Sequence, residues 1–168
     1  MCKKLQNEKI ILRAAESVWA ANKYFVLACS QQQYREIREL FRPEKRDLVT
    51  AHARLKEIDS MSHSVPSAEL PELSNALFHV AGYFKKIFTS VERQDLNAMI
   101  LGNPSRALAE LEKQTFHYQI DYLLPCRLWS LQRGRGFNEI PVSLNEQGQR
   151  YHPYSLAWCG DHLIFLPQ

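Results

Sequence analysis

The chain has 168 residues, of which 45% are apolar and 23% are charged, and 21 basic against 18 acidic side chains give a formal net charge of +3. These totals are typical of one soluble globular domain with a hydrophobic core. So small a positive surplus does not identify a partner.

Neither the cysteines nor the amino terminus indicates an exported or membrane protein. The four cysteines form no C-x-x-C pair and no dense framework, so reduced thiols are expected. Charged and polar residues interrupt every apolar stretch of the first 30 positions. We therefore expect no signal peptide and no membrane span, and a cytoplasmic location.

Apolar residues at helical spacing dominate the first half of the chain. They predict helices from Glu8 to Ala28, from Ser30 to Phe41 and from Asp47 to Asp59. Ser30 and Gln33 have the spacing of a capping box, which starts the second helix. The following segment, residues 60–72, is rich in Ser and Pro and is predicted to be a loop.

The strongest helical pattern begins at Pro71, which suits a first helical turn, and continues to Phe88. Thr89 and Glu92 form a second capping box, before a helix that ends at Gly102. A further helix is predicted over residues 105–124, up to Pro125, with a short helix through Leu128 and Leu131 after it.

The character of the sequence changes after residue 132. "IPVSL" reads as extended chain, and "YSLAWCGDHLIFL" predicts two short strands around Gly160 and Asp161. The predicted fold is mainly α: a single-domain helical bundle over residues 1–132, with residues 133–168 as a short C-terminal β-hairpin-like extension packed on it.

A metal site is considered because Cys159-x-x-His162 has half-site spacing and His152 lies nearby. A structural zinc ion needs four ligands, and only the distant Cys126 or His117 would complete the set. A hairpin turn explains the same residues, so we predict no metal and no cofactor.

Nucleophilic catalysis would require a Cys or Ser beside a base, and Cys29, Ser30, His79 and His117 would have to meet inside the bundle. No local signature supports this arrangement. A small buried Cys29 and hydrogen-bonded histidines are the simpler interpretation, and no residue is assigned a catalytic role.

Aromatic and basic residues alternate in three places, which is a pattern that could stack bases and contact phosphates. These places are Tyr34-Arg35, Tyr83 with Lys85 and Lys86, and "LQRGRGF" with Arg133. Lys85 and Lys86 are equally explained by the favourable position of positive charge near a helix end.

The segment "HVAGYFKK" puts His79 and Tyr83 on one helix face, with Gly82 beside them. Glycine inside a helix costs about 1 kcal/mol relative to alanine and usually marks a close approach. Two interpretations stay open, a polar notch for a ligand and a crossing of two helices at Gly82.

Two segments, "KYFVLACSQQQYREIRELF" and "NALFHVAGYFKKIFTSVERQDLNAMI", resemble the bacterial YbgA-like family, and "FHYQ" and "LWSLQR" follow in the same order. The resemblance covers roughly residues 18–133. It implies a helical domain of uncertain activity, found alone or fused after a thiouracil-desulfurase-type iron–sulfur domain, and sometimes encoded beside photolyase. It carries no catalytic roles. The matching residues are Lys23, Ala28, Ser30, Tyr34, His79, Gly82, Tyr83, His117 and Gln132. Trp19 and Cys29 stand where the family usually has histidine, which makes this chain a divergent member.

The sequence is therefore interpreted as a non-catalytic binding or accessory module linked to nucleic-acid or thionucleobase metabolism. Its ligand would be RNA, DNA or a nucleobase, and its partner a desulfurase-type iron–sulfur protein. A polar cleft between helices would be lined by Lys23, Tyr34, His79, Gly82, Tyr83, His117, Gln132 and Arg133. One alternative is an enzyme acting on a modified nucleobase with His79 or His117 as general base. A second alternative is a structural protein–protein interaction module.

Overall fold

The computed structural model describes residues 8–61 and 71–131, and four short strands within residues 143–165. The fold is mainly α, as predicted, with a β-hairpin near the carboxyl terminus. The helices are α1 (Glu8–Cys29), α2 (Gln31–Glu39), η1 (Pro43–Lys45), α3 (Leu48–Met61), α4 (Pro71–Ala81), η2 (Gly82–Phe84), α5 (Ser90–Gly102), α6 (Pro104–His117) and η3 (Arg127–Leu131), where η denotes a 3-10 helix.

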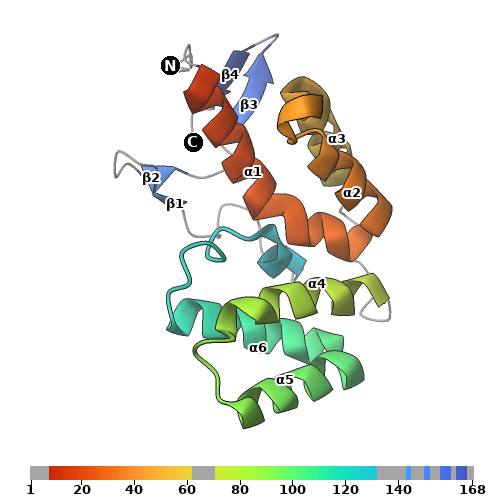
Figure 1. Ribbon diagram of the computed structural model, residues 1–168, viewed down its shortest axis with the longest axis vertical. Coiled ribbons are helices and arrows are strands. Elements are labelled where there is room, and N and C mark those ends of the chain that lie inside the picture. Colours follow the sequence, from red (N-terminus) through yellow and green to blue (C-terminus); the bar gives the residue numbers. More distant parts are fainter. Residues whose placement is uncertain are drawn as a thin grey trace.

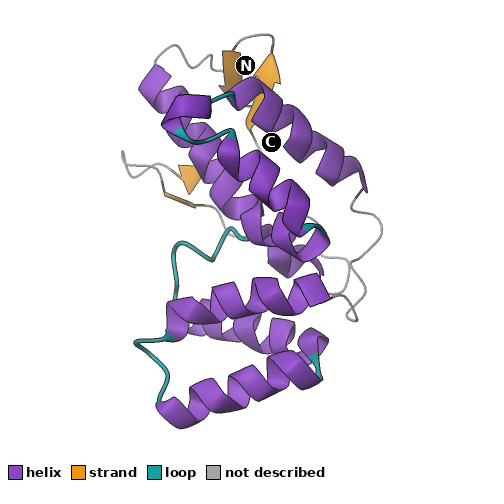
Figure 2. Cartoon of the chain, turned by 45° about the vertical axis from the view of Figure 1, so that its right-hand side comes forward, coloured by secondary structure: helices purple, strands orange, loops and turns teal. Residues whose placement is uncertain are grey.

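Two groups of helices meet at α4 (Figures 1 and 2). α1, α2 and α3 form one group, and α4, α5 and α6 form the other. α4 contacts α1 on one side and both α5 and α6 on the other, and η3 packs against α1. The buried face of α4 consists of Leu73, Ala76, Leu77 and Val80, so α4 lies at the centre of the core.

Side-chain caps begin the helices at the predicted places. The Ser30 hydroxyl accepts a hydrogen bond from the Gln33 backbone N–H at 3.2 Å. At α5 the predicted capping box is complete, because Thr89 accepts from the Glu92 backbone and the Glu92 carboxylate accepts from the Thr89 backbone at 2.7 Å. Asp47 caps α3 by accepting from the Thr50 backbone N–H. Each cap satisfies backbone donors that a helix terminus leaves open.

The expected long helix from Pro71 to Phe88 is wrong in its second half. The α-helix ends at Ala81, and Gly82–Phe84 forms a 3-10 turn. Glycine is a poor helix former, which accounts for the change at this position. Of the two interpretations of Gly82, the crossing of two helices is wrong, because a Cβ at this position would meet no heavy atom of the described residues within 4 Å. Phe84 is nevertheless fully buried.

The helix expected over residues 105–124 also ends early, at His117. Gln119 has φ 50°, in the left-handed region, and the Ile120 N–H donates to the Thr115 carbonyl at 3.1 Å. This is the Schellman arrangement that terminates helices. Gln119 also donates its side-chain amide to the Phe116 carbonyl at 2.6 Å. Glycine usually fills such a position, so the sequence contained no clear stop signal.

Two antiparallel strand pairs lie in the C-terminal segment. β1 (Ser143–Leu144) pairs with β2 (Arg150–Tyr151), and β3 (Leu156–Cys159) pairs with β4 (His162–Phe165). In the second pair Cys159 lies opposite His162, which confirms the predicted hairpin. The division into domains 1–132 and 133–168 stays a prediction. Among the described residues, no helix combines the length and apolar character needed to cross a membrane.

Candidate functional site: a tyrosine cluster with a lysine

Three tyrosines from three different segments form a cluster, called here the tyrosine cluster. Tyr24 comes from α1, Tyr83 from η2, and Tyr122 from the turn after α6. The Tyr24 hydroxyl donates to the Tyr83 hydroxyl at 3.1 Å. The rings of Tyr83 and Tyr122 stack with centroids 5.4 Å apart and an interplanar angle of 13°. Tyr24 is 5% exposed and Tyr122 is 42% exposed, so the cluster extends from the core to the surface.

A lysine lies over two of these rings. The ammonium nitrogen of Lys23 is 4.7 Å from the ring centroid of Tyr24 and 4.8 Å from that of Tyr122. Both distances are within the range of cation–π attraction. Lys23 and Tyr24 are consecutive on α1, so the helix itself positions the charge beside the cluster. The result is a positive charge next to a half-exposed aromatic ring.

Burial makes two of these phenols harder to ionise. It raises the pKa of Tyr24, and the hydrogen bond that Tyr24 donates to Tyr83 raises it further. Burial also raises the pKa of Tyr122 and outweighs the lowering by a hydrogen bond with Tyr83. Tyr24 and Tyr122 therefore keep their protons well above neutral pH. The half-exposed Tyr122 hydroxyl can both donate and accept hydrogen bonds.

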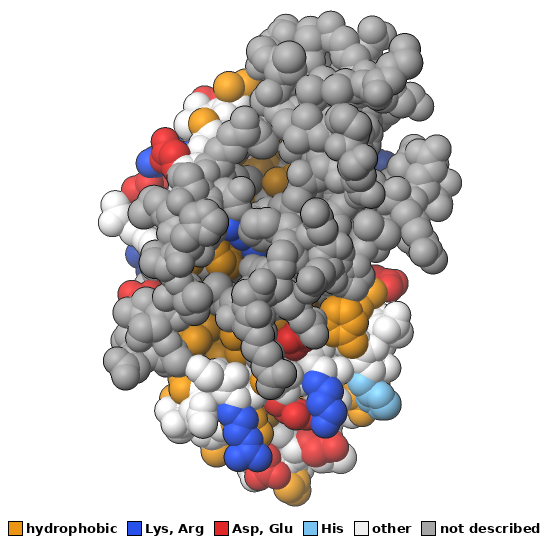
Figure 3. All heavy atoms as spheres, turned by 180° about the vertical axis from the view of Figure 1, so that it is seen from behind, with side chains coloured by type: hydrophobic (Ala, Val, Ile, Leu, Met, Phe, Trp, Pro, Cys, Tyr) orange, Lys and Arg blue, Asp and Glu red, His pale blue; other side chains and the backbone are white. Residues whose placement is uncertain are grey.

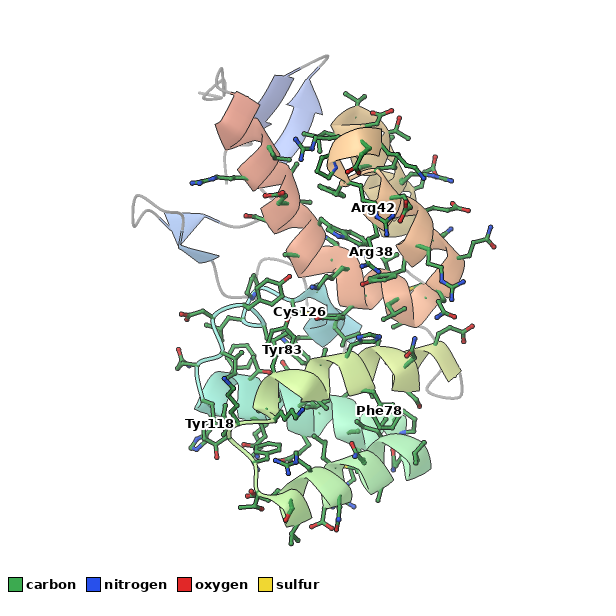
Figure 4. All side chains as sticks on the ribbon, viewed as in Figure 1. Arg38, Arg42, Phe78, Tyr83, Tyr118 and Cys126 are labelled. Carbon is green, nitrogen blue, oxygen red and sulfur yellow. The ribbon has the colours of Figure 1, made fainter. Side chains whose placement is uncertain are left out.

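Cys29, at the end of α1, and Cys126, just before η3, are poor nucleophiles. Cys126 is buried, and burial raises the pKa of its thiol to about 12, although a backbone hydrogen bond from Leu128 and the charge of Lys23 act in the opposite direction. Burial raises the pKa of Cys29 to about 11, against a smaller lowering by Arg127. Both are thiols at neutral pH, whereas the thiolate is the nucleophile. Cys126 is near the tyrosine cluster, since it acts electrostatically on Tyr24 and Tyr122, and it lies just above Tyr83 in the view of Figure 4.

The structure brings four of the predicted site residues to this region. Lys23 and Tyr83 belong to it directly, and the exposed His79 stacks its ring on Tyr24 at 6.5 Å between centroids. Tyr34, on α2, packs on Trp19 at 5.6 Å between ring centroids, and Trp19 lies one turn before Lys23 on α1. These residues come from α1, α2, α4 and η2.

The other predicted residues do not join them within the described part of the chain. His117 is exposed at the end of α6, and its ring contacts that of Tyr118 at 4.7 Å between centroids. Gly82 is exposed and borders open space. Gln132 and Arg133 lie outside the described residues. A single cleft lined by all eight residues therefore stays a prediction.

The positions where the resemblance expects histidine have structural roles here. Trp19 is buried, and its ring packs against Tyr34 at 5.6 Å and Phe41 at 5.8 Å between centroids. This contact joins α2 to α1. The Cys29 side chain is near Arg127, whose charge lowers its pKa.

A buried arginine connects η3 to α1. Arg127 is 2% exposed, and its guanidinium carbon lies 4.1 Å from the ring centroid of Phe25. It also donates to the side-chain oxygen of Asn22 at 3.3 Å. The segment that carries Cys126 is thereby held against α1. Asn22 and Arg127 have no recognisable sequence signal, since isolated polar residues in a helical pattern are usually exposed.

Sequence reasoning also missed Tyr24 and Tyr122. The spacing of Tyr122 suggested a core position in a continuous helix, and Tyr24 stood beside the lysine without a distinctive pattern. A lysine next to an aromatic residue was the only available signal.

The described surface opposite the view of Figure 1 shows acidic and basic side chains intermixed over its lower half (Figure 3), with no continuous basic face there.

A family model described as "Protein of unknown function (DUF1722)" matches residues 23–124. Because the match covers more than half of the chain, the chain belongs to this family. No curated protein and no solved structure matches the chain. The matched residues include Lys23 and the three members of the tyrosine cluster.

Proposed function

We propose that this DUF1722 domain is a non-catalytic module that binds a ligand containing a nucleobase and a phosphate at the tyrosine cluster. One observation carries the proposal, namely the Lys23 ammonium over Tyr122, a ring that is 42% exposed and stacked on Tyr83. Nucleotides combine a planar ring with a nearby negative charge. Aromatic side chains stack on bases, and lysine contacts phosphates.

Binding would exchange one contact of Lys23 for another. The flexible lysine side chain would leave the ring of Tyr122, a base would stack in its place, and the ammonium group would contact the phosphate. The cation–π contact at a half-exposed ring contributes only about 0.5–1 kcal/mol. Stacking of one base contributes about 1–3 kcal/mol, so the exchange is favourable.

The resemblance to the YbgA-like family supports the same class of ligand. It covers roughly residues 18–133, which includes the residues matched by the family model. Relatives of that kind occur fused to a thiouracil-desulfurase-type domain. In this proposal the domain would hold a nucleobase, or the strand that carries it, for such a partner in the cytoplasm. The raised pKa values of Cys29 and Cys126 weigh against an enzyme that uses a thiolate.

The test is calorimetric titration with a 5′-phosphorylated uridine dinucleotide at low salt. Replacing Tyr122 by alanine should weaken binding about 5- to 150-fold, which corresponds to the 1–3 kcal/mol of one stacked base. Lys23→Gln should also weaken it and should reduce its salt dependence.

Tyr118→Ala is the matched control, because Tyr118 has the same exposed fraction, 42%, and contacts Phe88 and His117 instead of a lysine. Its affinity should equal that of the wild type. Absence of dinucleotide binding, or equal losses in the Tyr118 and Tyr122 variants, would contradict the proposal. Circular dichroism confirms that each variant is folded.

A further inference from the structure

A basic surface lies on α2 and η1, beyond the tyrosine cluster. The stretch 35–46 contains five basic and three acidic residues. All five basic side chains are exposed. They are Arg35, Arg38, Arg42, Lys45 and Arg46.

Two of the acidic residues are already engaged. Glu36 pairs with Arg54 of α3 at 2.7 Å. Glu39 is shared by Arg42 at 3.0 Å and Lys45 at 3.4 Å. Within the described part of the chain, Arg35 and Arg38 have no carboxylate within 4.0 Å. Arg38 therefore presents a positive charge to solvent.

Arg38 lies on the same side of α2 as Tyr34. The two residues are four positions apart, which places them on one helix face with a rise of about 6 Å between them. Arg42 follows after the end of α2 and is the N-cap residue of η1. Figure 4 shows Arg38 and Arg42 close together in the upper group of helices, above Cys126 and Tyr83 in that view.

Tyr34 connects this basic surface to the tyrosine cluster. It is half-buried and packs on Trp19 at 5.6 Å between ring centroids. Trp19 lies one helical turn before Lys23 on α1, and Lys23 lies over the ring of Tyr122. The order along the surface is therefore Tyr122, Tyr34, Arg38 and Arg42.

We propose that a single-stranded nucleic acid binds along these residues, called here the track, with a base on Tyr122 and backbone phosphates at Arg38 and Arg42. The inference rests on the proposed function of the tyrosine cluster and extends the ligand from a nucleotide to a strand. Stacked nucleotides rise about 3.4 Å each, whereas Tyr34 and Arg38 alone are about 6 Å apart along α2, and Tyr122 and Arg42 lie beyond them at either end. A mononucleotide cannot occupy both ends.

The arginines suit phosphate contacts chemically. The planar guanidinium group binds phosphate oxygens in a bidentate manner. The Arg42–Glu39 pair has side-chain exposures of 53% and 34%. An ion pair so exposed is weak, so Arg42 can exchange Glu39 for a phosphate at little cost.

The experiment compares the 5′-phosphorylated uridine dinucleotide with an oligouridine and an oligodeoxythymidine of about ten nucleotides, which is within the site sizes of single-strand binders. The double variant Arg38→Gln/Arg42→Gln should weaken binding of the longer strand. Two lost phosphate contacts should reduce the slope of log K against log salt by about 1.4. Dinucleotide binding should not change.

The control is Arg106→Gln/Lys113→Gln on α6, which removes the same charge at two exposed positions. It should leave the affinity for the longer strand and its salt slope as they are in the wild type. The strand, RNA or DNA, whose binding depends on Arg38 and Arg42 identifies the ligand.

Three results separate the two proposals. If binding of the longer strand depends on Tyr122 but not on Arg38 and Arg42, the track is refuted, and the nucleotide site at the tyrosine cluster is unaffected. If binding of the longer strand depends on Arg38 and Arg42 but not on Tyr122, the strand does not continue from the tyrosine cluster, and the proposal of one continuous track is refuted. Absence of Tyr122-dependent dinucleotide binding overturns the proposed function itself.

Discussion

The central position of α4 can be tested with two leucine-to-alanine substitutions. Leu77 is fully buried in α4, and Leu101 is 72% exposed at the end of α5. Leu77→Ala loses the transfer free energy of the removed atoms and leaves a cavity, which together cost about 3–4 kcal/mol. Leu101→Ala removes a side chain of which only about a quarter is buried. Because full burial of a leucine is worth about 1.5–3 kcal/mol, this substitution should lower the free energy of unfolding by less than about 1 kcal/mol.

Urea unfolding, followed by circular dichroism, measures both variants against the wild type. With a slope of about 2 kcal/mol per molar urea, Leu77→Ala should lower the midpoint by about 1.5–2 M and Leu101→Ala by less than about 0.5 M. Equal shifts, or a larger shift for Leu101, would refute the packing of α4 between α1 and the pair of α5 and α6.

Three further predictions concern a cap, a carboxyl group and a thiol. Thr89→Ala should lower the free energy of unfolding by about 1 kcal/mol in thermal or urea unfolding, because the α5 capping box loses its hydroxyl. Hydrogen bonds from Thr89, first from its backbone and then from its side chain, lower the pKa of Glu92. The stability that wild type has over Glu92→Gln should therefore be complete at neutral pH, above the unfolded pKa of the carboxyl, and should disappear in acid as pH falls through the folded pKa. Because Cys126 is buried with its pKa raised to about 12, peptide mapping should find it alkylated by iodoacetamide at neutral pH only after unfolding; modification in the native state would contradict its placement.

The helical fold was predictable because its signals are local. The caps at Ser30 and Thr89 depend on residues three positions apart, and both form as expected. The apolar positions of α4 repeat at helical spacing, and the same positions are buried. The hairpin of β3 and β4 was also visible as two short apolar runs around a turn.

Helix ends were less predictable than helix centres. At Gly82 the apolar pattern continues to Phe84, so spacing could not show that the backbone changes from α to 3-10 geometry. At Gln119 the left-handed conformation is stabilised by hydrogen bonds to Thr115 and Phe116. Non-glycine residues such as Gln119 rarely adopt this conformation, so the sequence does not predict the end of the helix there.

The sequence by itself determined that the chain is helical, where most helices begin, and which faces they bury, since these depend on neighbours within a few residues. It also identified Lys23, Tyr34, His79 and Tyr83 as polar or aromatic residues worth attention. Only the tertiary structure decided that Tyr24 and Tyr122, far apart in the chain, meet at Tyr83 beneath Lys23. Their contact depends on how α1, η2 and the turn after α6 pack together, and periodicity along one segment contains no information about contacts between distant segments.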